Sequence, residues 1–137
     1  MARILQGLAH IRVFSMPSEW TACAAFYRDT LGLDEIYTDP DAGVAVFEVG
    51  ADLTLGLERV PEDEPDEWEL AGRFTGISFR VGDMARAYEL YVARGVAFDG
   101  PPERMDWGGI LAHFNDPAGN TLTLVEEPSE EDLLGAG

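Results

Sequence analysis

Apolar and polar positions alternate along two stretches of the chain that follow the same plan. Residues 6–15 are rich in Ile, Val and Phe and alternate with a period of two, which predicts a strand. A helix follows, with Ser18 as its N-cap and apolar residues at helical spacing, and Gly32 ends it. Three further strands are predicted near residues 33–39, 43–49 and 53–60.

The plan starts again after an acidic, proline-containing linker at residues 61–73. Residues 74–82 alternate like a strand, Asp83 caps a helix with an apolar stripe, and Gly95 ends that helix. Strands are predicted near residues 96–99, 108–115 and 120–126. Equivalent elements of the two halves recur at a nearly constant spacing, which indicates an internal repeat.

A tight turn joins the last two predicted strands. Asp116 and Pro117 begin it, and Gly119 and Asn120 are residues that tolerate a positive φ. The fold class that follows is α+β, with two βαβββ units whose mixed sheets curl into a cup and whose helices lie outside. Residues 1–137 then form a single domain, with unit one at about 6–60, unit two at about 74–127, and a flexible acidic tail at 128–137.

Charge narrows the choice of partners. The chain carries 26 acidic and nine basic residues, a net charge of −17, and this field argues against nucleic acid. The charge fits either attraction of a cationic ligand or simple solubility. No apolar run is long enough to span a membrane and the N-terminus has no signal-peptide pattern, so we expect a cytoplasmic protein with no membrane partner.

Three motifs resemble those of the vicinal oxygen chelate superfamily, which includes glyoxalase I, extradiol dioxygenases and bleomycin-resistance proteins. They are Gly-Leu-Ala-His-Ile at residues 7–11, the helix end at 25–33, and Asp-Pro-Ala-Gly-Asn at 116–120. The resemblance covers residues 6–127 and implies the cup-shaped fold and a homodimer. It leaves the function open, because this fold hosts many chemistries.

Metal-using members of that superfamily place a His or Glu ligand at each of four equivalent strand positions. Carried over by position, these fall on His10, Leu55, Gly76 and Thr123. Only His10 is a usual ligand for a divalent ion. Because three of the four positions depart from the family pattern, we expect no bound metal and no other cofactor, although a divalent metal stays the disfavoured alternative.

Strand alternation predicts the residues that line the cup. If His10 faces inward, Arg12 and Phe14 face inward too. The same argument places in the wall Leu55 with its neighbours Leu53 and Leu57, then Ser78, Arg80 and Thr123. The predicted lining is mainly apolar, which suits a small organic ligand.

Each polar candidate has a simpler alternative. His10 is either an acid–base catalyst or a hydrogen-bonding wall residue, and we expect His113 to be a surface or turn-bracing residue and not a catalyst. Arg12 and Arg80 either clamp a ligand carboxylate or form an ion pair, for instance with Glu48. Trp107 precedes two glycines, as in bleomycin-resistance proteins, and either stacks on a ligand or packs at the sheet edge.

The sequence thus predicts a glyoxalase/bleomycin-resistance-like protein that binds a small organic molecule in a mostly apolar cup without a catalytic metal. The alternative is a metal-dependent or His-based lyase or isomerase of the glyoxalase kind. It would need further ligands such as Glu48, Glu58 or Glu126. Alternation puts Glu58 and Glu126 on the face opposite Leu55 and Thr123, so the choice depends on strand register.

Overall fold

The computed structural model describes residues 3–50 and 52–135. The chain divides into two compact units, Met1–Ala71 and Gly72–Gly137, and the division falls at the end of the acidic linker. Each unit contains the β-α-β-β-β order that the sequence predicts, and the α+β class is confirmed. No helix in the described part of the chain is long and apolar enough to cross a membrane.

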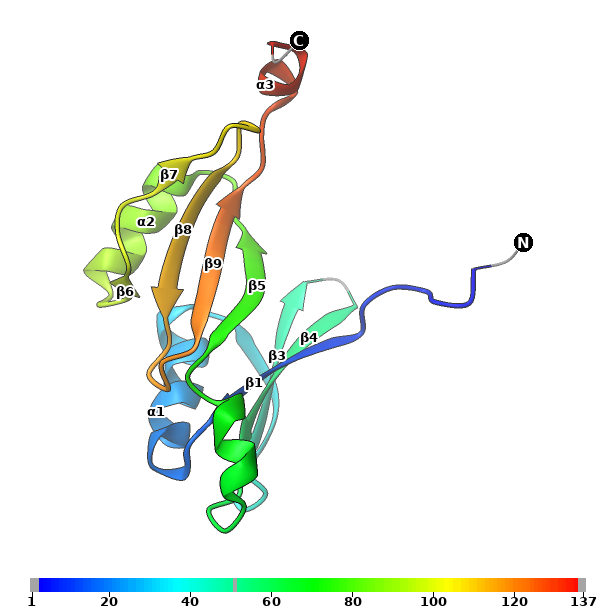
Figure 1. Cartoon of the computed structure of the whole chain (residues 1–137), viewed down its shortest axis with the longest axis vertical. Helices are drawn as coiled ribbons and strands as arrows, with labels where there is room; N and C mark the ends of the chain where they lie inside the picture. The colour runs from blue at the N-terminus through cyan, green and yellow to red at the C-terminus, as the bar shows by residue number, and fades with distance from the viewer. Residues whose placement is uncertain (1–2, 51, 136–137) are drawn as a thin grey trace. The chain divides into compact units, whose positions relative to one another are not determined.

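Unit 1 is a four-stranded sheet with a helix on one face (Figure 1). Its strands lie in the order β1-β4-β3-β2, with β1 parallel to β4 and the other pairs antiparallel. Its elements are β1 (His10–Ser15), η1 (Pro17–Glu19), α1 (Trp20–Ala25), η2 (Phe26–Thr30), β2 (Asp34–Asp39), β3 (Val44–Gly50), β4 (Leu53–Arg59) and η3 (Pro65–Leu70).

The core of unit 1 lies between the sheet and its helix. Val13 of β1 pairs with Leu57 of β4, and both are buried. Tyr27 of the helical segment is fully buried, with its ring 5.9 Å from that of Phe47 on β3. Burying a side chain of this size stabilises the fold by about 1.5–3 kcal/mol. Hydrophobic burial therefore fixes which sheet face the helix covers.

The start of the first helix differs from the prediction. Ser18 is not its N-cap, because Pro17–Glu19 already form a 3₁₀ turn closed by the bond from Glu19 N to Met16 O. Glu19 takes the cap position of α1 without a side-chain hydrogen bond. The predicted end is confirmed: Gly32 has a φ of 80°, which favours glycine after a helix.

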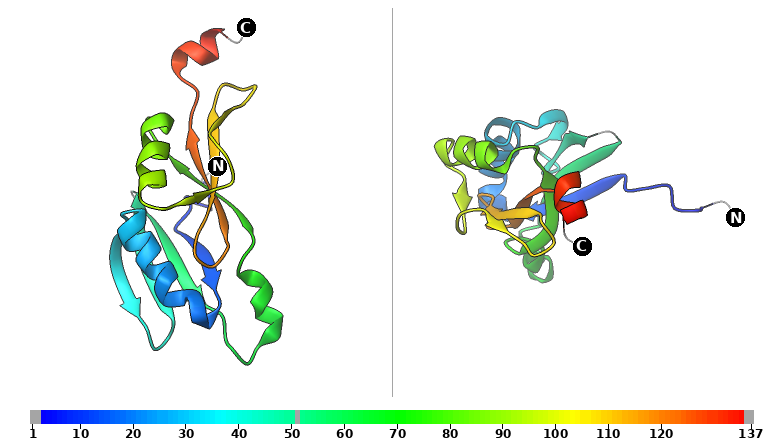
Figure 2. Two further views of the ribbon diagram at one scale, coloured as in Figure 1. Left: turned by 90° about the vertical axis from the view of Figure 1, so that its left-hand side faces the viewer. Right: turned by 90° about the horizontal axis from the view of Figure 1, so that it is seen from above.

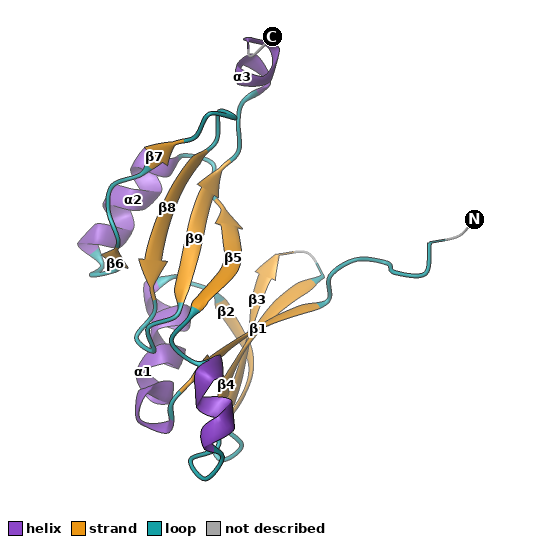
Figure 3. Cartoon of the chain, viewed as in Figure 1, coloured by secondary structure: helices purple, strands orange, loops and turns teal. Residues whose placement is uncertain are grey.

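Unit 2 repeats this plan with additions (Figure 3). Its strand order is β5-β9-β8-β6, and β7 also pairs with β8. The helix α2 lies against one face of the sheet (Figure 2). Its elements are β5 (Phe74–Arg80), α2 (Met84–Ala93), β6 (Ala97–Phe98), β7 (Glu103–Arg104), β8 (Ile110–Asn115), β9 (Thr121–Glu126) and α3 (Glu130–Gly135).

Two of these elements are absent from the predictions. The strand β7 is only two residues long, and α3 lies in the segment that the composition marks as a flexible tail. The Ser129 hydroxyl accepts a hydrogen bond from Asp132 N, and the Asp132 carboxylate accepts one from Ser129 N. This reciprocal capping box is what begins α3 within an acidic run.

The turn between β8 and β9 anchors the start of unit 2. Of the two turn residues that tolerate a positive φ, Gly119 adopts one, at 83°, and Asn120 does not. Asn120 is instead fully buried, and its side-chain oxygen accepts from Gly72 N at 2.9 Å. Its amide nitrogen donates to Asp116 Oδ2 at 2.9 Å. The motif therefore ties the chain entering β5 to the far end of the same sheet.

Candidate ligand-binding site

Each sheet has one face packed on its own helix and a second, open face that carries polar side chains. In unit 1 the register of β1 and β4 decides which residues share the open face. His10 pairs with Thr54, and Arg12 pairs with Gly56. Paired residues of parallel neighbours point to the same side. The open face of unit 1 therefore carries His10, Arg12, Phe14, Thr54, Gly56 and Glu58.

The predicted place of Leu55 in the ligand-binding wall is wrong. Leu55 pairs with Ile11 and is fully buried on the helix side, together with Leu57. The predicted alternation along β4 is offset by one residue from the observed register, and such an offset moves every side chain of a strand to the other face of the sheet. Thr54 takes the position beside His10 that the family resemblance had assigned to Leu55.

His10 is held by two neighbours on β4 that the sequence reading missed. Its Nδ1 lies 2.6 Å from the Thr54 hydroxyl oxygen. A Cβ on Gly56 would lie 2.6 Å from His10 Nε2, so the imidazole occupies the space that a side chain there would fill. The hydroxyl and the glycine together fix the position of the ring. Their only signal in the sequence is the Leu-Thr-Leu-Gly alternation of β4.

Arg12 forms an ion pair, which was one of the two roles predicted for it. Its Nε and Nη2 both donate to the Glu58 carboxylate, the second at 3.1 Å. Its guanidinium carbon also lies 5.3 Å from the centre of the Phe14 ring. The hydrogen bonds and charge of Glu58 raise the pKa of Arg12. The partner is Glu58 and not Glu48. Glu58 does lie on the face opposite Leu55, as predicted, but that face is the open one and carries Arg12.

In unit 2 the predicted alternation agrees with the observed register. Ser78 pairs with Thr123 and Arg80 with Val125, so these four residues share the open face. Arg80 is largely exposed and forms an ion pair with Glu127 at 3.1 Å. Like Arg12, it matches the ion-pair alternative.

His113 is a residue whose importance the sequence reading missed. It pairs with Thr123 on the open face of unit 2, and its Nδ1 lies 2.8 Å from the Thr123 hydroxyl. The ring of Phe74 packs edge-on at 6.1 Å. These contacts place the His113 ring against Thr123 of β9 and Phe74 of β5. Each unit carries one such pair, His10 with Thr54 and His113 with Thr123.

A cavity of about 340 Å³ lies over this part of unit 2. Leu111, Met105 and two prolines supply its apolar wall, and His113, Asp99 and Glu103 supply its polar groups. Asp99 is held in place because its carboxylate accepts from Asn115 Nδ2 at 3.0 Å. The cavity therefore combines an apolar wall with two carboxylates, and its volume lies in the range of small-molecule sites.

Trp107 follows Met105 by two residues in the loop between β7 and β8, and it is not among the described residues that line the cavity. Met105 N donates to Gly109 O at 2.8 Å and closes the loop. A Cβ on Gly109 would lie 1.9 Å from the Trp107 ring, so the indole packs directly over that glycine. Gly108 supplies a φ of 94°. The two glycines thus hold Trp107 with 52% of its surface exposed, which leaves area for stacking.

The residues at the four family positions do not fit a divalent metal. Unit 1 presents His10 and Thr54, and unit 2 presents Gly76 and Thr123. Glycine has no donor atom, and both neutral threonine hydroxyls already contact a histidine nitrogen. Within residues 3–50 and 52–135, no group of three or more His, Cys, Asp or Glu side chains is placed to hold a metal ion.

Comparisons with known proteins agree with the fold. A sequence model of the Glyoxalase/Bleomycin resistance protein/Dioxygenase superfamily matches residues 7–124. The uncharacterized protein YraH of Bacillus subtilis (strain 168) is 25% identical over 124 residues, which cover 85% of this chain and 96% of YraH.

Several solved structures are also similar. A superfamily member from Sphaerobacter thermophilus DSM 20745 is 31% identical, with a TM-score of 0.74 over 91% of this chain and 100% of its own. TnmS3, an antibiotic binding protein from Streptomyces sp. CB03234, is 29% identical, with a TM-score of 0.70 over 93% of this chain and 100% of its own. Lactoylglutathione lyase from Agrobacterium tumefaciens is 20% identical, with a TM-score of 0.70 over 89% and 94% of the two chains, and shows the fold alone.

Proposed function

Because this chain belongs to the Glyoxalase/Bleomycin resistance protein/Dioxygenase superfamily, we propose that it binds a small organic molecule on the open face of unit 2, without a catalytic metal. The observation that carries this proposal is the cavity of about 340 Å³ that Met105, Leu111 and His113 help to line. Its apolar wall suits an organic body, and its carboxylates suit a positively charged or hydrogen-bond-donating group.

Electrostatics supports a ligand with cationic character. Asp99 and Glu103 both lie at the cavity, and the chain as a whole carries a charge of −17. A field of this sign raises the local concentration of cations and repels anions, nucleic acid included. The similarity to TnmS3, which binds an antibiotic, supports the same class of function.

The lyase or isomerase alternative has less support. Metal-dependent chemistry would need donors that the family positions of this chain lack. A metal-free reaction would need His10 or His113 as a base, and among the described residues each imidazole contacts a threonine hydroxyl and no carboxylate that would orient it for this role. The similarity to lactoylglutathione lyase adds nothing to this alternative, because it concerns the fold.

A thermal-shift experiment separates these functions. The protein is first treated with a chelator and then titrated with a cationic glycopeptide antibiotic or with Zn²⁺, Ni²⁺ or Mn²⁺. We expect the antibiotic to raise the Tm, because a ligand that binds only the folded state stabilises it. One equivalent of tightly bound metal that restores the Tm after chelation would contradict the proposal.

We also propose that the protein is a homodimer. Ile4, Leu5 and Leu8 are 91%, 80% and 75% exposed on the extended segment that leads into β1 (Figure 1). That strand is at the edge of its sheet, where unpaired backbone groups can accept a partner strand. Light scattering during gel filtration should give twice the mass of 15.0 kDa, and Leu5→Ser should shift the equilibrium toward the monomer.

A further inference from the structure

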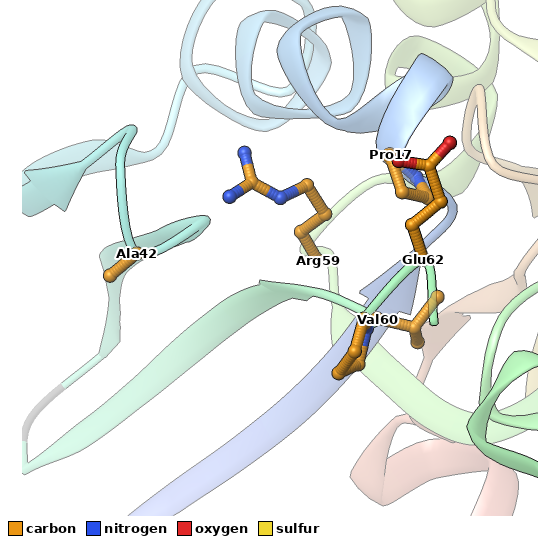
Figure 4. Close-up of a pocket in the computed structure, with 6 residues that line it drawn as sticks. Pro17, Ala42, Arg59, Val60 and Glu62 are labelled. Atoms are coloured by element: carbon orange, nitrogen blue, oxygen red, sulfur yellow. The ribbon is translucent and has the colours of Figure 1, made fainter. Parts of the chain in front are cut away.

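Unit 1 has a pocket of about 530 Å³ that is separate from its open sheet face (Figure 4). Arg59, which lines it, pairs with Ser15, so its side chain shares the face of Val13 and Leu57. His10 and Arg12 lie on the other face of the same sheet. The pocket is formed by η1, by the turn between β2 and β3, and by the residues that follow β4.

The guanidinium of Arg59 is fixed in this pocket without a carboxylate. Its Nη1 donates to Pro40 O at 3.0 Å and its Nη2 donates to Asp41 O at 2.9 Å. A Cβ on Gly43 would lie 2.6 Å from Arg59 Cβ, so the absence of a side chain lets the arginine cross to these carbonyls. Two of its five N–H groups are used, and no acidic side chain of the described residues forms an ion pair with it.

A carboxylate lies elsewhere in the same pocket. Figure 4 shows the Glu62 carboxylate apart from the Arg59 guanidinium. Glu62 is exposed, and no ion pair joins it to Arg59 or to any other described residue. Pro17, Val60 and Pro61 supply the apolar part of the wall. The pocket therefore presents a held cation and a separate anion, with three apolar side chains in the same wall.

We propose that this pocket binds an apolar α-amino acid as its zwitterion. The ligand carboxylate accepts hydrogen bonds from the free N–H groups of Arg59, and its ammonium group donates to Glu62. A ligand with only a negative charge would pair with Arg59 but be repelled by Glu62. A ligand with only a positive charge would pair with Glu62 but be repelled by Arg59. A zwitterion has no net charge, and the charge of −17 on the chain does not repel it.

NMR titration of the ¹⁵N-labelled protein tests this site. The probes are L-leucine, N-acetyl-L-leucine, which lacks the ammonium group, and L-leucinamide, which lacks the carboxylate. We expect L-leucine to shift the amide signals of Ala42, Val60 and Glu62 in a saturable way. Loss of one charge-assisted hydrogen bond should weaken each blocked analogue about tenfold or more.

Variants separate this site from the open face of unit 2. Glu62→Gln should weaken leucine binding about tenfold and leave folding unchanged, because the carboxylate has no partner to lose. Arg59→Lys should also weaken it, because lysine lacks the planar fork. The controls are Glu69→Gln, an acid of the same linker that does not line the pocket, and Arg73→Lys in unit 2.

The proposal is overturned if leucine gives no saturable shift at millimolar concentration, if all three probes bind alike, or if Glu62→Gln binds like the wild type. It is supported only if the zwitterion is preferred and both charged residues matter. Antibiotic binding on unit 2, measured on the same variants, should stay unchanged, so failure of one proposal is distinguishable from failure of the other.

Discussion

The imidazole of His10 lies over Gly56, at the point where a side chain on β4 would have to be. A Cβ at Gly56 would come within 2.6 Å of His10 Nε2, while His10 Nδ1 lies 2.6 Å from the Thr54 hydroxyl. Both β4 residues share the face of His10 because β1 and β4 run parallel in this register. His10 is the only histidine at the four family metal positions, and the place of its ring thus depends on Thr54 and Gly56.

Gly56→Ala should displace His10 without unfolding the protein. The new methyl group occupies the place of an exposed ring that can rotate into solvent, so we expect a change in unfolding free energy below about 1 kcal/mol. The measurement is the ¹⁵N chemical shift of the His10 ring, which should lose the signature of the Thr54 contact. Gly50→Ala is the control, because nothing lies within 4 Å of a Cβ there. An unchanged His10 signal in Gly56→Ala would contradict the geometry.

The pair of Arg12 and Glu58 should contribute little to stability. The side chains are 55% and 30% exposed, and exposed ion pairs are worth about 0.2–1 kcal/mol. A double-mutant cycle with Arg12→Met and Glu58→Gln should therefore give a coupling energy below about 1 kcal/mol that falls as salt is added. A larger, salt-independent coupling would mean that the pair is buried, as a clamp at a closed site would be.

Asn120→Ala should destabilise unit 2 far more than a surface substitution does. The side chain is fully buried, and it bonds both Gly72 N and the Asp116 carboxylate. Leaving a buried charged group short of a donor costs about 2–3 kcal/mol. Urea unfolding measures this loss, and Pro117→Ala in the exposed part of the same turn is the control. Equal stability of the two variants would show that the turn does not anchor β5.

The C-terminal helix should respond to acid through Asp132. Hydrogen bonds from the backbone and hydroxyl of Ser129 lower the pKa of Asp132 below its usual value. A carboxyl group with a lowered pKa stabilises the folded form above the ordinary pKa of Asp, and this contribution is lost as pH falls through the lowered value. The Ser129 amide signal in NMR should move across that acidic range, and Asp132→Asn should abolish the movement.

The element plan could be predicted from the sequence because it depends on short-range patterns. Asp83 is the N-cap of α2, with its side chain accepting from Arg86 N, and Gly95 has a φ of 87° after the helix, as local chemistry requires. The four strands of the first sheet and four of the five strands of the second follow from apolar alternation, which residues near in sequence determine. Strand β7 was not predicted because it contains only Glu103 and Arg104, and two residues are too few to show an alternation of apolar and polar positions.

The site was harder to predict, because it depends on register between distant strands. The choice between Leu55 and Thr54 as the neighbour of His10 is a shift of one residue across a separation of 44. Arg12 could be expected to have an acidic partner, but its identity as Glu58 needs the same register. In unit 2 the predicted alternation agrees with the observed register, and Ser78, Arg80 and Thr123 share one face.

Gly109→Ala should disturb the candidate ligand site of unit 2 through Trp107. The added methyl group would lie 1.9 Å from the indole, so the ring must leave its place over the glycine. We expect antibiotic affinity to fall about tenfold, within the range of one lost stacking contact, with little change in the unfolding free energy. The indole N–H signal of Trp107 in NMR reports the displacement directly. Gly100→Ala is the control, because Gly100 lines the cavity and a Cβ there meets nothing within 4 Å. If the indole signal moves and affinity does not, Trp107 packs at the sheet edge and does not bind the ligand.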